Sequence, residues 1–191
     1  MPRLLIFTAA VVLGLGGPAW VGSPTEQLRT YTEQVMKVLE NRALTAPERV
    51  TAVRAVANEV FDVPETAKRA LGVHWQQRSA GERAEFVEIF RSLLEQTYLS
   101  RINEFGGERI RDVSERIDGE RASVRAVIVT KNGTEVPVES RLLQNADRWL
   151  IYDVLIENIS LIASYRAQFD RVIRTASYPE LIRRLKSHGS L

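Results

Sequence analysis

The 191-residue chain contains no cysteine. It therefore cannot form a disulfide framework, a thiolate metal site, a thiol nucleophile or a lipidated cysteine anchor. Its two histidines, His74 and His188, lack the local spacing of a metal site. The 26 basic and 24 acidic residues are mixed along the chain, without the concentrated basic charge that nucleic-acid binding requires. We therefore expect no metal, no redox chemistry of cysteine and no nucleic-acid partner.

The N-terminus has the layout of a secretory signal peptide. A short basic start precedes an apolar run over residues 4–15, and small or helix-breaking residues follow before Ser23. We predict a signal peptide over 1–22. The alternative is an uncleaved membrane anchor, but the run is shorter than the about 20 apolar residues that span a bilayer. An exported protein without cysteine fits a bacterial periplasm, where folding need not depend on disulfides.

A serine or threonine followed three residues later by glutamate marks the beginning of several helices, because each side chain satisfies a free backbone amide of the first turn. Four such pairs occur: Ser23 with Glu26, Thr45 with Glu48, Ser79 with Glu82, and Ser177 with Glu180. Together with the apolar periodicity they predict helices over 24–41, 46–61, 80–102, 159–175 and 179–187, and a short helix from Pro64 to Gly72.

From Glu108 onward the apolar period changes from 3.6 to 2, which predicts strands. Turn pairs at Asp118-Gly119 and Asn132-Gly133 separate them. The pattern predicts an antiparallel meander with strands over 108–117, 120–131, 134–144 and 148–157. No linker or repeat interrupts the helices and strands, so we expect one α+β domain over 23–191.

Two registers are open for the middle hairpin of this meander. A two-residue turn would place apolar residues of one strand on the charged face of the next. A three-residue loop ending in a left-handed Gly133 instead pairs Ile128 with Val136 and Ala126 with Val138. We predict the second register, because only it gathers both apolar sets on one face.

The fourth predicted strand is apolar on both faces apart from Asp153. A strand buried on both sides is central in its sheet or lies beside a cavity. A buried carboxylate at this position is either a general base with a shifted pKa or the partner of an arginine or of backbone amides. The second interpretation is the more common role for a carboxylate near the end of a strand in an arginine-rich chain.

Residues 149–169, with the sequence WLIYDVLIENISLIASYRAQF, resemble the signature segment of the MlaC family, also called the toluene-tolerance auxiliary family. The family pattern runs approximately WxVYDVxIEGVSLVxNYRxxF. The matching positions are Trp149, Tyr152, Asp153, Val154, Ile156, Glu157, Ser160, Leu161, Tyr165, Arg166 and Phe169. Two positions depart from the family: Asn158 replaces a usual glycine, and Ser140 stands where many relatives have an aromatic residue.

The resemblance implies an α+β fold in which helices pack around a twisted antiparallel sheet of about four strands and enclose an apolar lipid pocket. It implies a periplasmic phospholipid carrier that is not an enzyme and whose only bound group is its lipid cargo. The implied partners are an outer-membrane lipoprotein complex and an inner-membrane ABC transporter with an MCE-domain protein, and the implied role is to maintain outer-membrane lipid asymmetry. Two alternatives stay open: a carrier of another membrane lipid such as a hopanoid, and an exported enzyme that uses Asp153 on a hydrophobic small molecule.

We predict that lipid lies between the apolar face of the sheet and the aromatic helices. The expected sheet residues are Val124, Ala126, Ile128, Val136, Val138, Leu142, Trp149 and Ile151. The expected helical residues are Leu94, Tyr98, Ile162, Tyr165 and Phe169. Asp153 and Arg166 are interpreted as structural residues.

Overall fold

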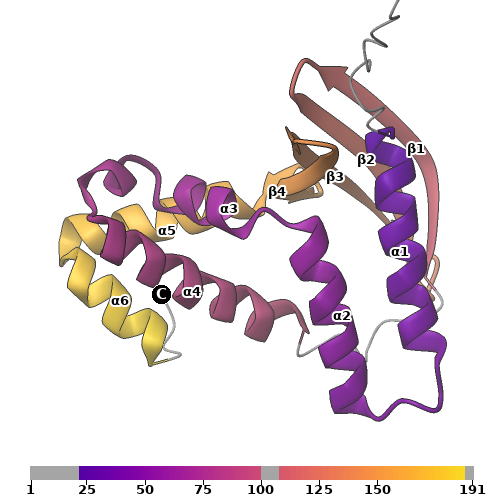
Figure 1. Ribbon diagram of the computed structural model, residues 1–191, viewed down its shortest axis with the longest axis horizontal. Coiled ribbons are helices and arrows are strands. Elements are labelled where there is room, and N and C mark those ends of the chain that lie inside the picture. Colours follow the sequence, from indigo (N-terminus) through magenta and orange to yellow (C-terminus); the bar gives the residue numbers. More distant parts are fainter. Residues whose placement is uncertain (1–21, 100–107, 188–191) are drawn as a thin grey trace, which may run out of the picture.

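A computed structural model describes residues 22–99 and 108–187. Its elements are, in chain order, α1 (Pro24–Glu40), α2 (Ala46–Val60), α3 (Val63–Leu71), the 3-10 helix η1 (Gly72–Gln77), α4 (Ala80–Tyr98), β1 (Arg109–Asp118), β2 (Arg121–Val129), β3 (Glu135–Asn145), β4 (Arg148–Ile156), β5 (Ile159–Ser160), α5 (Leu161–Thr175) and α6 (Tyr178–Lys186). The sheet with α1 and α2 forms one end of the molecule, and α3 to α6 form the other (Figure 1). The α+β prediction is confirmed.

The predicted helix starts are confirmed. Ser23, Thr45 and Ser79 each cap a helix, and each donates its backbone amide to the carboxylate of the glutamate three residues further on. Ser177 accepts the backbone amide of Glu180 at 3.2 Å, but that carboxylate binds two arginines of the same helix. The signal peptide predicted over 1–22 lies outside the described residues except for its last position, as do positions 100–102 of the predicted fourth helix.

The strands form one antiparallel sheet in the order β1-β2-β3-β4-β5, as the meander prediction requires. Ala126 pairs with Val138 and Ile128 with Val136, so the predicted register is confirmed. Gly133 has φ +80°, the left-handed conformation expected at the end of the loop. The last hairpin turns through Glu157 and Asn158, which both have positive φ. Asparagine tolerates this conformation at the position where glycine is usual.

A register shift divides β4. Leu142 of β3 pairs with Ile151, but the preceding residue Arg141 pairs with Asp153, so Tyr152 is an extra residue without a partner in the ladder. Such a bulge changes which alternate residues point to each face of the strand. Because of the bulge, Val154 and Ile156 lie on the same face of the sheet as Leu142 and Ile151.

Each end of the molecule has its own hydrophobic cluster. The sheet cluster lies where α1 and α2 cover the sheet, and it consists of Val60, Ala122, Val124, Leu142, Trp149 and Ile151, with Leu28, Tyr31, Phe61 and Val154 packed against them. The helical cluster joins α3, α4, α5 and α6, and its centre is the fully buried trio Phe86, Phe90 and Phe169. The two edge-to-face contacts of Phe169 with Phe86 and Phe90 have ring centroids 5.7 Å apart.

Within the described ranges, no helix has the length and apolar character needed to cross a bilayer.

Candidate functional site

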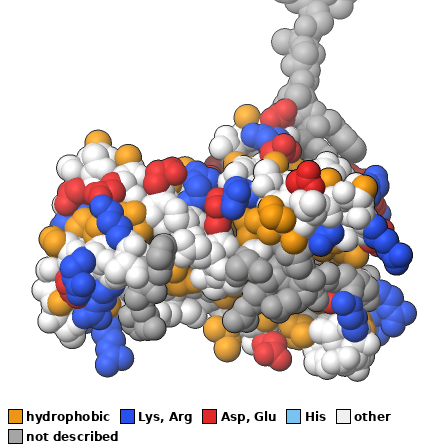
Figure 2. Space-filling view, turned by 90° about the horizontal axis from the view of Figure 1, so that it is seen from below, with side chains coloured by type: hydrophobic (Ala, Val, Ile, Leu, Met, Phe, Trp, Pro, Cys, Tyr) orange, Lys and Arg blue, Asp and Glu red, His pale blue; other side chains and the backbone are white. Residues whose placement is uncertain are grey.

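A cavity of about 310 Å³ lies between the two hydrophobic clusters. Its walls come from α2, α3, α4, β4 and the first turn of α5. The lining residues are Arg54, Ala57, Asn58, Phe61, Val63, Thr66, Arg91, Leu94, Glu95, Tyr98, Leu99, Tyr152, Asp153, Val154, Ile156, Leu161 and Ile162. In the space-filling view, hydrophobic side chains are visible between the sheet end and the helical end of the molecule (Figure 2). The cavity is therefore mainly apolar, with its charged groups on a few positions.

The sheet wall of the cavity is the half of β4 that follows the register shift. Val154 pairs with Ser140 and Ile156 with Val138, and partners in a ladder share a face of the sheet. The cavity therefore borders the sheet face on which the sequence predicts the apolar residues of the lipid pocket.

The helical wall combines α2 with α4. Ala57 and Phe61 face Leu94 and Tyr98 across the cavity. Burial, followed by the charge of Tyr165 and a hydrogen bond to that hydroxyl, raises the pKa of Tyr98 well above its ordinary value. Tyr98 is therefore a neutral wall residue, and 40% of its surface stays exposed.

Polar contacts connect α2 to α4 beside the cavity. Arg54 binds Glu95 with 2.8 Å between Nε and Oε2, and Arg91 donates a hydrogen bond to the side-chain oxygen of Asn58 at 2.9 Å. All four residues line the cavity. Arg54 and Glu95 neutralise each other, and the charge of Arg91 is paired with the Glu88 carboxylate 3.5 Å away.

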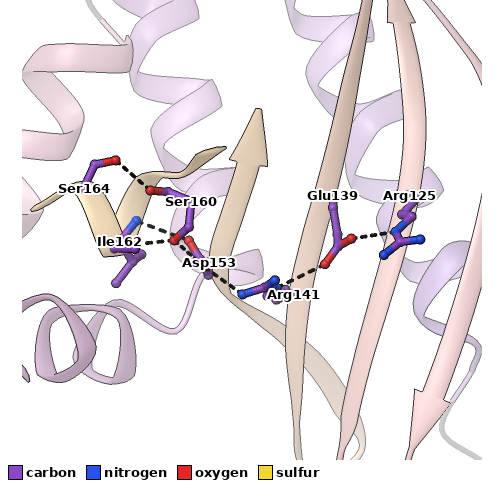
Figure 3. A network of polar contacts seen from close by, with 8 residues as sticks. Arg125, Glu139, Arg141, Asp153, Ser160, Ile162 and Ser164 are labelled. Atoms are coloured by element: carbon purple, nitrogen blue, oxygen red, sulfur yellow. Dashed lines mark hydrogen bonds and ion pairs between the residues drawn. The ribbon is translucent and has the colours of Figure 1, made fainter. Parts of the chain in front are cut away.

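Asp153 is the buried carboxylate of the cavity, with 7% of its surface exposed. It accepts hydrogen bonds from the Ser160 hydroxyl at 2.7 Å and from the Ile162 backbone amide at 3.2 Å, and the Arg141 guanidinium lies 3.6 Å away (Figure 3). The carboxylate therefore anchors the N-terminus of α5 to β4. This is the structural interpretation made from the sequence, with both an arginine and a backbone amide as partners.

The same network continues across the sheet. Glu139 accepts hydrogen bonds from Arg125 at 2.6 Å and from Arg141 at 3.1 Å (Figure 3). Burial by itself raises the pKa of Glu139, but the hydrogen bonds and charges of the two arginines outweigh it and hold the pKa below its ordinary value. Glu139 is therefore ionised at neutral pH, and Arg141 is shared between it and Asp153.

His74 is the one histidine among the described residues, and it lies away from the cavity. His74 pairs with Asp170, with 2.8 Å between Nε2 and Oδ1, which the sequence does not predict, and its contacts are on η1 and α5, away from the cavity lining. Among the described residues, no group of three or more histidine or acidic side chains has the arrangement of a metal site.

The structure distributes the predicted site residues over four places. Those in the cavity wall are Leu94, Tyr98 and Ile162. Those buried in the sheet cluster are Val124, Leu142, Trp149 and Ile151. Those half-buried on the same sheet face, but outside the cavity lining, are Ala126, Ile128, Val136 and Val138. Those in or against the helical cluster are Tyr165 and Phe169.

Sequence reasoning did not predict the contribution of α2 to the cavity. Ala57 and Phe61 belong to the apolar stripe of this helix, but periodicity does not show which surface a stripe covers. Tyr152, Val154 and Ile156 were also not predicted as wall residues, because strict alternation from Ile151 places them on the opposite face. The match of these three residues to the family signature was the signal that could have identified them.

A solved structure of similar fold is the phospholipid-binding protein from Ralstonia solanacearum in complex with a phospholipid. It superposes with a TM-score of 0.73 at 20% sequence identity, over 85% of this chain and 94% of that chain. The family model described as MlaC protein matches residues 29–187, which include every described helix and strand except the first turn of α1. The chain therefore belongs to the MlaC family.

Proposed function

We propose that this protein is an exported phospholipid carrier of the periplasm. Residues 1–22 would direct export, and the single domain over 23–191 would hold the lipid. It would shuttle phospholipid between an outer-membrane lipoprotein complex and an inner-membrane ABC transporter with an MCE-domain protein, and so maintain outer-membrane lipid asymmetry. No step in this role changes a covalent bond of the lipid.

The observation that carries the proposal is the apolar cavity between the sheet and α2 and α4. Two acyl chains contain about 30 methylenes in total. Exposing them to water costs about 25 kcal/mol, at about 0.8 kcal/mol for each methylene. A barrier of that size permits spontaneous escape from a bilayer about once in several days. A protein that replaces the bilayer interior with apolar walls removes most of this cost.

The size of the cavity bears on how the lipid is held. A volume of about 310 Å³ holds about ten groups of the size of a water molecule or a methylene. Two acyl chains are larger, so we propose that they extend from Ile156 onto the neighbouring sheet face. Val138 lies opposite Ile156, and Ala126 lies opposite Val138, so these half-buried residues continue the apolar surface. Ile128 and Val136 follow along the same two strands.

Two other functions compete with this one. A hopanoid or another membrane lipid would use the same apolar walls, and identification of the bound molecule separates it from a phospholipid. An enzyme would use Asp153 as a base, but both of its oxygens accept hydrogen bonds that hold α5. Lipid returned unmodified from the protein supports a carrier.

The test is phospholipid uptake from vesicles by the chain beginning at Ser23, which contains every described element. Ala57→Phe places a large side chain in the cavity and is expected to lower the lipid bound per protein at least about fivefold, because overpacking the occupied cavity costs more than about 1 kcal/mol. The matched control is Ala55→Phe on the exposed side of α2, which is expected to bind lipid like the unchanged chain. Equal uptake by both folded variants would remove the cavity from the proposed site.

A further inference from the structure

The face of β1, β2 and β3 opposite α1 and α2, named the outer face here, is rich in arginine. Ala122, Val124 and Leu142 point toward α1, so the residues that alternate with them lie on the other side. The ladders place the following residues on the outer face: Arg109, Arg111, Ser114, Arg116, Asp118, Arg121, Ser123, Arg125, Val127, Val129, Glu135, Pro137, Glu139, Arg141 and Leu143. These include six arginines and three carboxylates.

The outer face therefore carries an excess of three positive charges, six against three, whereas the whole chain has a net charge of +2. Its side chains are accessible: Arg125 is 71% exposed, and Arg109, Arg116 and Arg121 are also exposed. The space-filling view shows Lys and Arg side chains at the sheet end of the molecule as well as at the helical end (Figure 2). Such an asymmetry gives the molecule a preferred orientation toward an anionic surface.

Pairing within the outer face leaves three arginines available. Glu135 binds Arg111, and Glu139 binds both Arg125 and Arg141. In residues 22–99 and 108–187, no ion pair or hydrogen bond involves the side chains of Arg109, Arg116 or Arg121. The described part of the outer face therefore presents three guanidinium groups that have no ion-pair partner, with Asp118 opposite Arg121 in the ladder.

Two of these arginines border a hollow of about 200 Å³ in the outer face. Arg116, Arg121, Arg141 and Ser123 line it, and so do the two carboxylates Asp118 and Glu139, so the hollow has three positive and two negative side chains. Guanidinium groups and hydroxyls are the donors that bind phosphate oxygens, and guanidinium does so with two parallel hydrogen bonds. Tyr152 lines both this hollow and the lipid cavity, so the two sites are separated by a single side chain.

We propose that the outer face is a docking surface for an anionic phospholipid membrane. A protein partner would need a desolvated apolar or aromatic centre, and the outer face has no Trp, Tyr, Phe or Met among its ladder residues. A membrane surface requires only charge, which the three arginines without an ion-pair partner supply beside the hollow. Docking by this face would hold the wall of the cavity next to the bilayer. The docking proposal does not depend on what the cavity contains.

The test is binding of the chain beginning at Ser23 to vesicles of phosphatidylcholine with and without phosphatidylglycerol, measured by co-sedimentation at low salt. Binding is expected only with phosphatidylglycerol and is expected to weaken as salt rises. The combined variant Arg109→Gln, Arg116→Gln and Arg121→Gln is expected to bind on the order of a hundredfold more weakly, from about fivefold for each charge.

The matched control is Arg29→Gln, Arg42→Gln and Arg171→Gln, which removes three exposed charges from outside the outer face. It is expected to lose less than about fivefold, because these charges do not approach the surface in the docked orientation. Equal losses in the two triple variants, or no binding of the unchanged chain to phosphatidylglycerol, would overturn the proposal. Both triple variants are expected to retain phospholipid uptake, so a failure here is distinguishable from a failure of the carrier function.

Discussion

Asp153 accepts a hydrogen bond from the hydroxyl of Ser160 at 2.7 Å, across the tight turn that joins β4 to α5. The Ser160 hydroxyl in turn accepts the backbone amide of Ala163 at 2.9 Å, and Asp153 accepts that of Ile162. Two side chains thus satisfy the first turn of α5 and attach it to the strand that forms the cavity wall. These hydrogen bonds position α5, whose first turn lines the cavity and whose later residues belong to the helical cluster.

Replacing Asp153 with asparagine is expected to lower the free energy of unfolding by about 2 kcal/mol, because hydrogen bonds to a charged group contribute about 1.5–3 kcal/mol. Urea unfolding followed by circular dichroism measures the change. The control, Asp118→Asn, changes an exposed carboxylate and is expected to stay within about 0.5 kcal/mol of the unchanged chain. Equal stabilities for the two variants would contradict the anchoring role.

Gly72 occupies a conformation that side chains avoid, with φ +58° and ψ −130° at the end of α3. A Cβ atom at this position would lie 3.0 Å from Cδ of Arg166. Gly72→Ala is therefore expected to lower the free energy of unfolding by about 1–3 kcal/mol. The control is Gly81→Ala in the first turn of α4, where a Cβ atom meets nothing within 4 Å and a gain of up to about 1 kcal/mol is expected. Thermal unfolding of both variants checks the opposite signs.

Arg54→Gln removes the ion pair that joins α2 to α4 beside the cavity. A partly exposed pair contributes at most about 1 kcal/mol, so lipid exchange with vesicles is expected to be up to about fivefold faster, at almost unchanged stability. Fluorescent phospholipid transfer measures the rate. Lys68→Gln breaks a comparable pair within α3, which does not bridge the cavity, and is expected to leave the rate unchanged. The same acceleration in both variants would exclude a specific effect of the α2–α4 contact.

Val138→Asp tests whether acyl chains leave the cavity along the sheet. Because Val138 lies opposite Ile156, a carboxylate there would contact the chains, and bound phospholipid is expected to fall about tenfold from the cost of burying a polar group. The readout is lipid extracted per folded protein. Val73→Asp, at a position that is 76% exposed, is the control and is expected to retain its lipid. If Val138→Asp retains lipid as well, the sheet residues beyond Ile156 do not belong to the site.

Local sequence signals predicted most of the fold because each has a local physical cause. The capping pairs at Ser23, Thr45 and Ser79 satisfy backbone amides of their own helices, so they need no knowledge of the tertiary structure. The register of β2 and β3 follows from the requirement that apolar residues share a face and that Gly133 takes the left-handed conformation.

The cavity was less accessible to sequence reasoning because it depends on two non-local features. The extra residue Tyr152 reverses the alternation of side chains between the two faces of β4. The residue types of this strand do not distinguish a regular strand from a bulged one. The contact of α2 with α4 brings together residues such as Arg54 and Glu95, which are 41 positions apart in the chain. Leu94, Tyr98 and Ile162 lie on helix faces that turn toward the sheet whether or not β4 is bulged. The sequence therefore predicted these three residues in the cavity wall.

The most direct test of the carrier function is native mass spectrometry of the protein, purified from cells without detergent, followed by extraction and identification of any bound molecule. We expect one intact, unmodified diacyl phospholipid per protein. A protein that is reproducibly empty, and that takes up no phospholipid from vesicles, would contradict it.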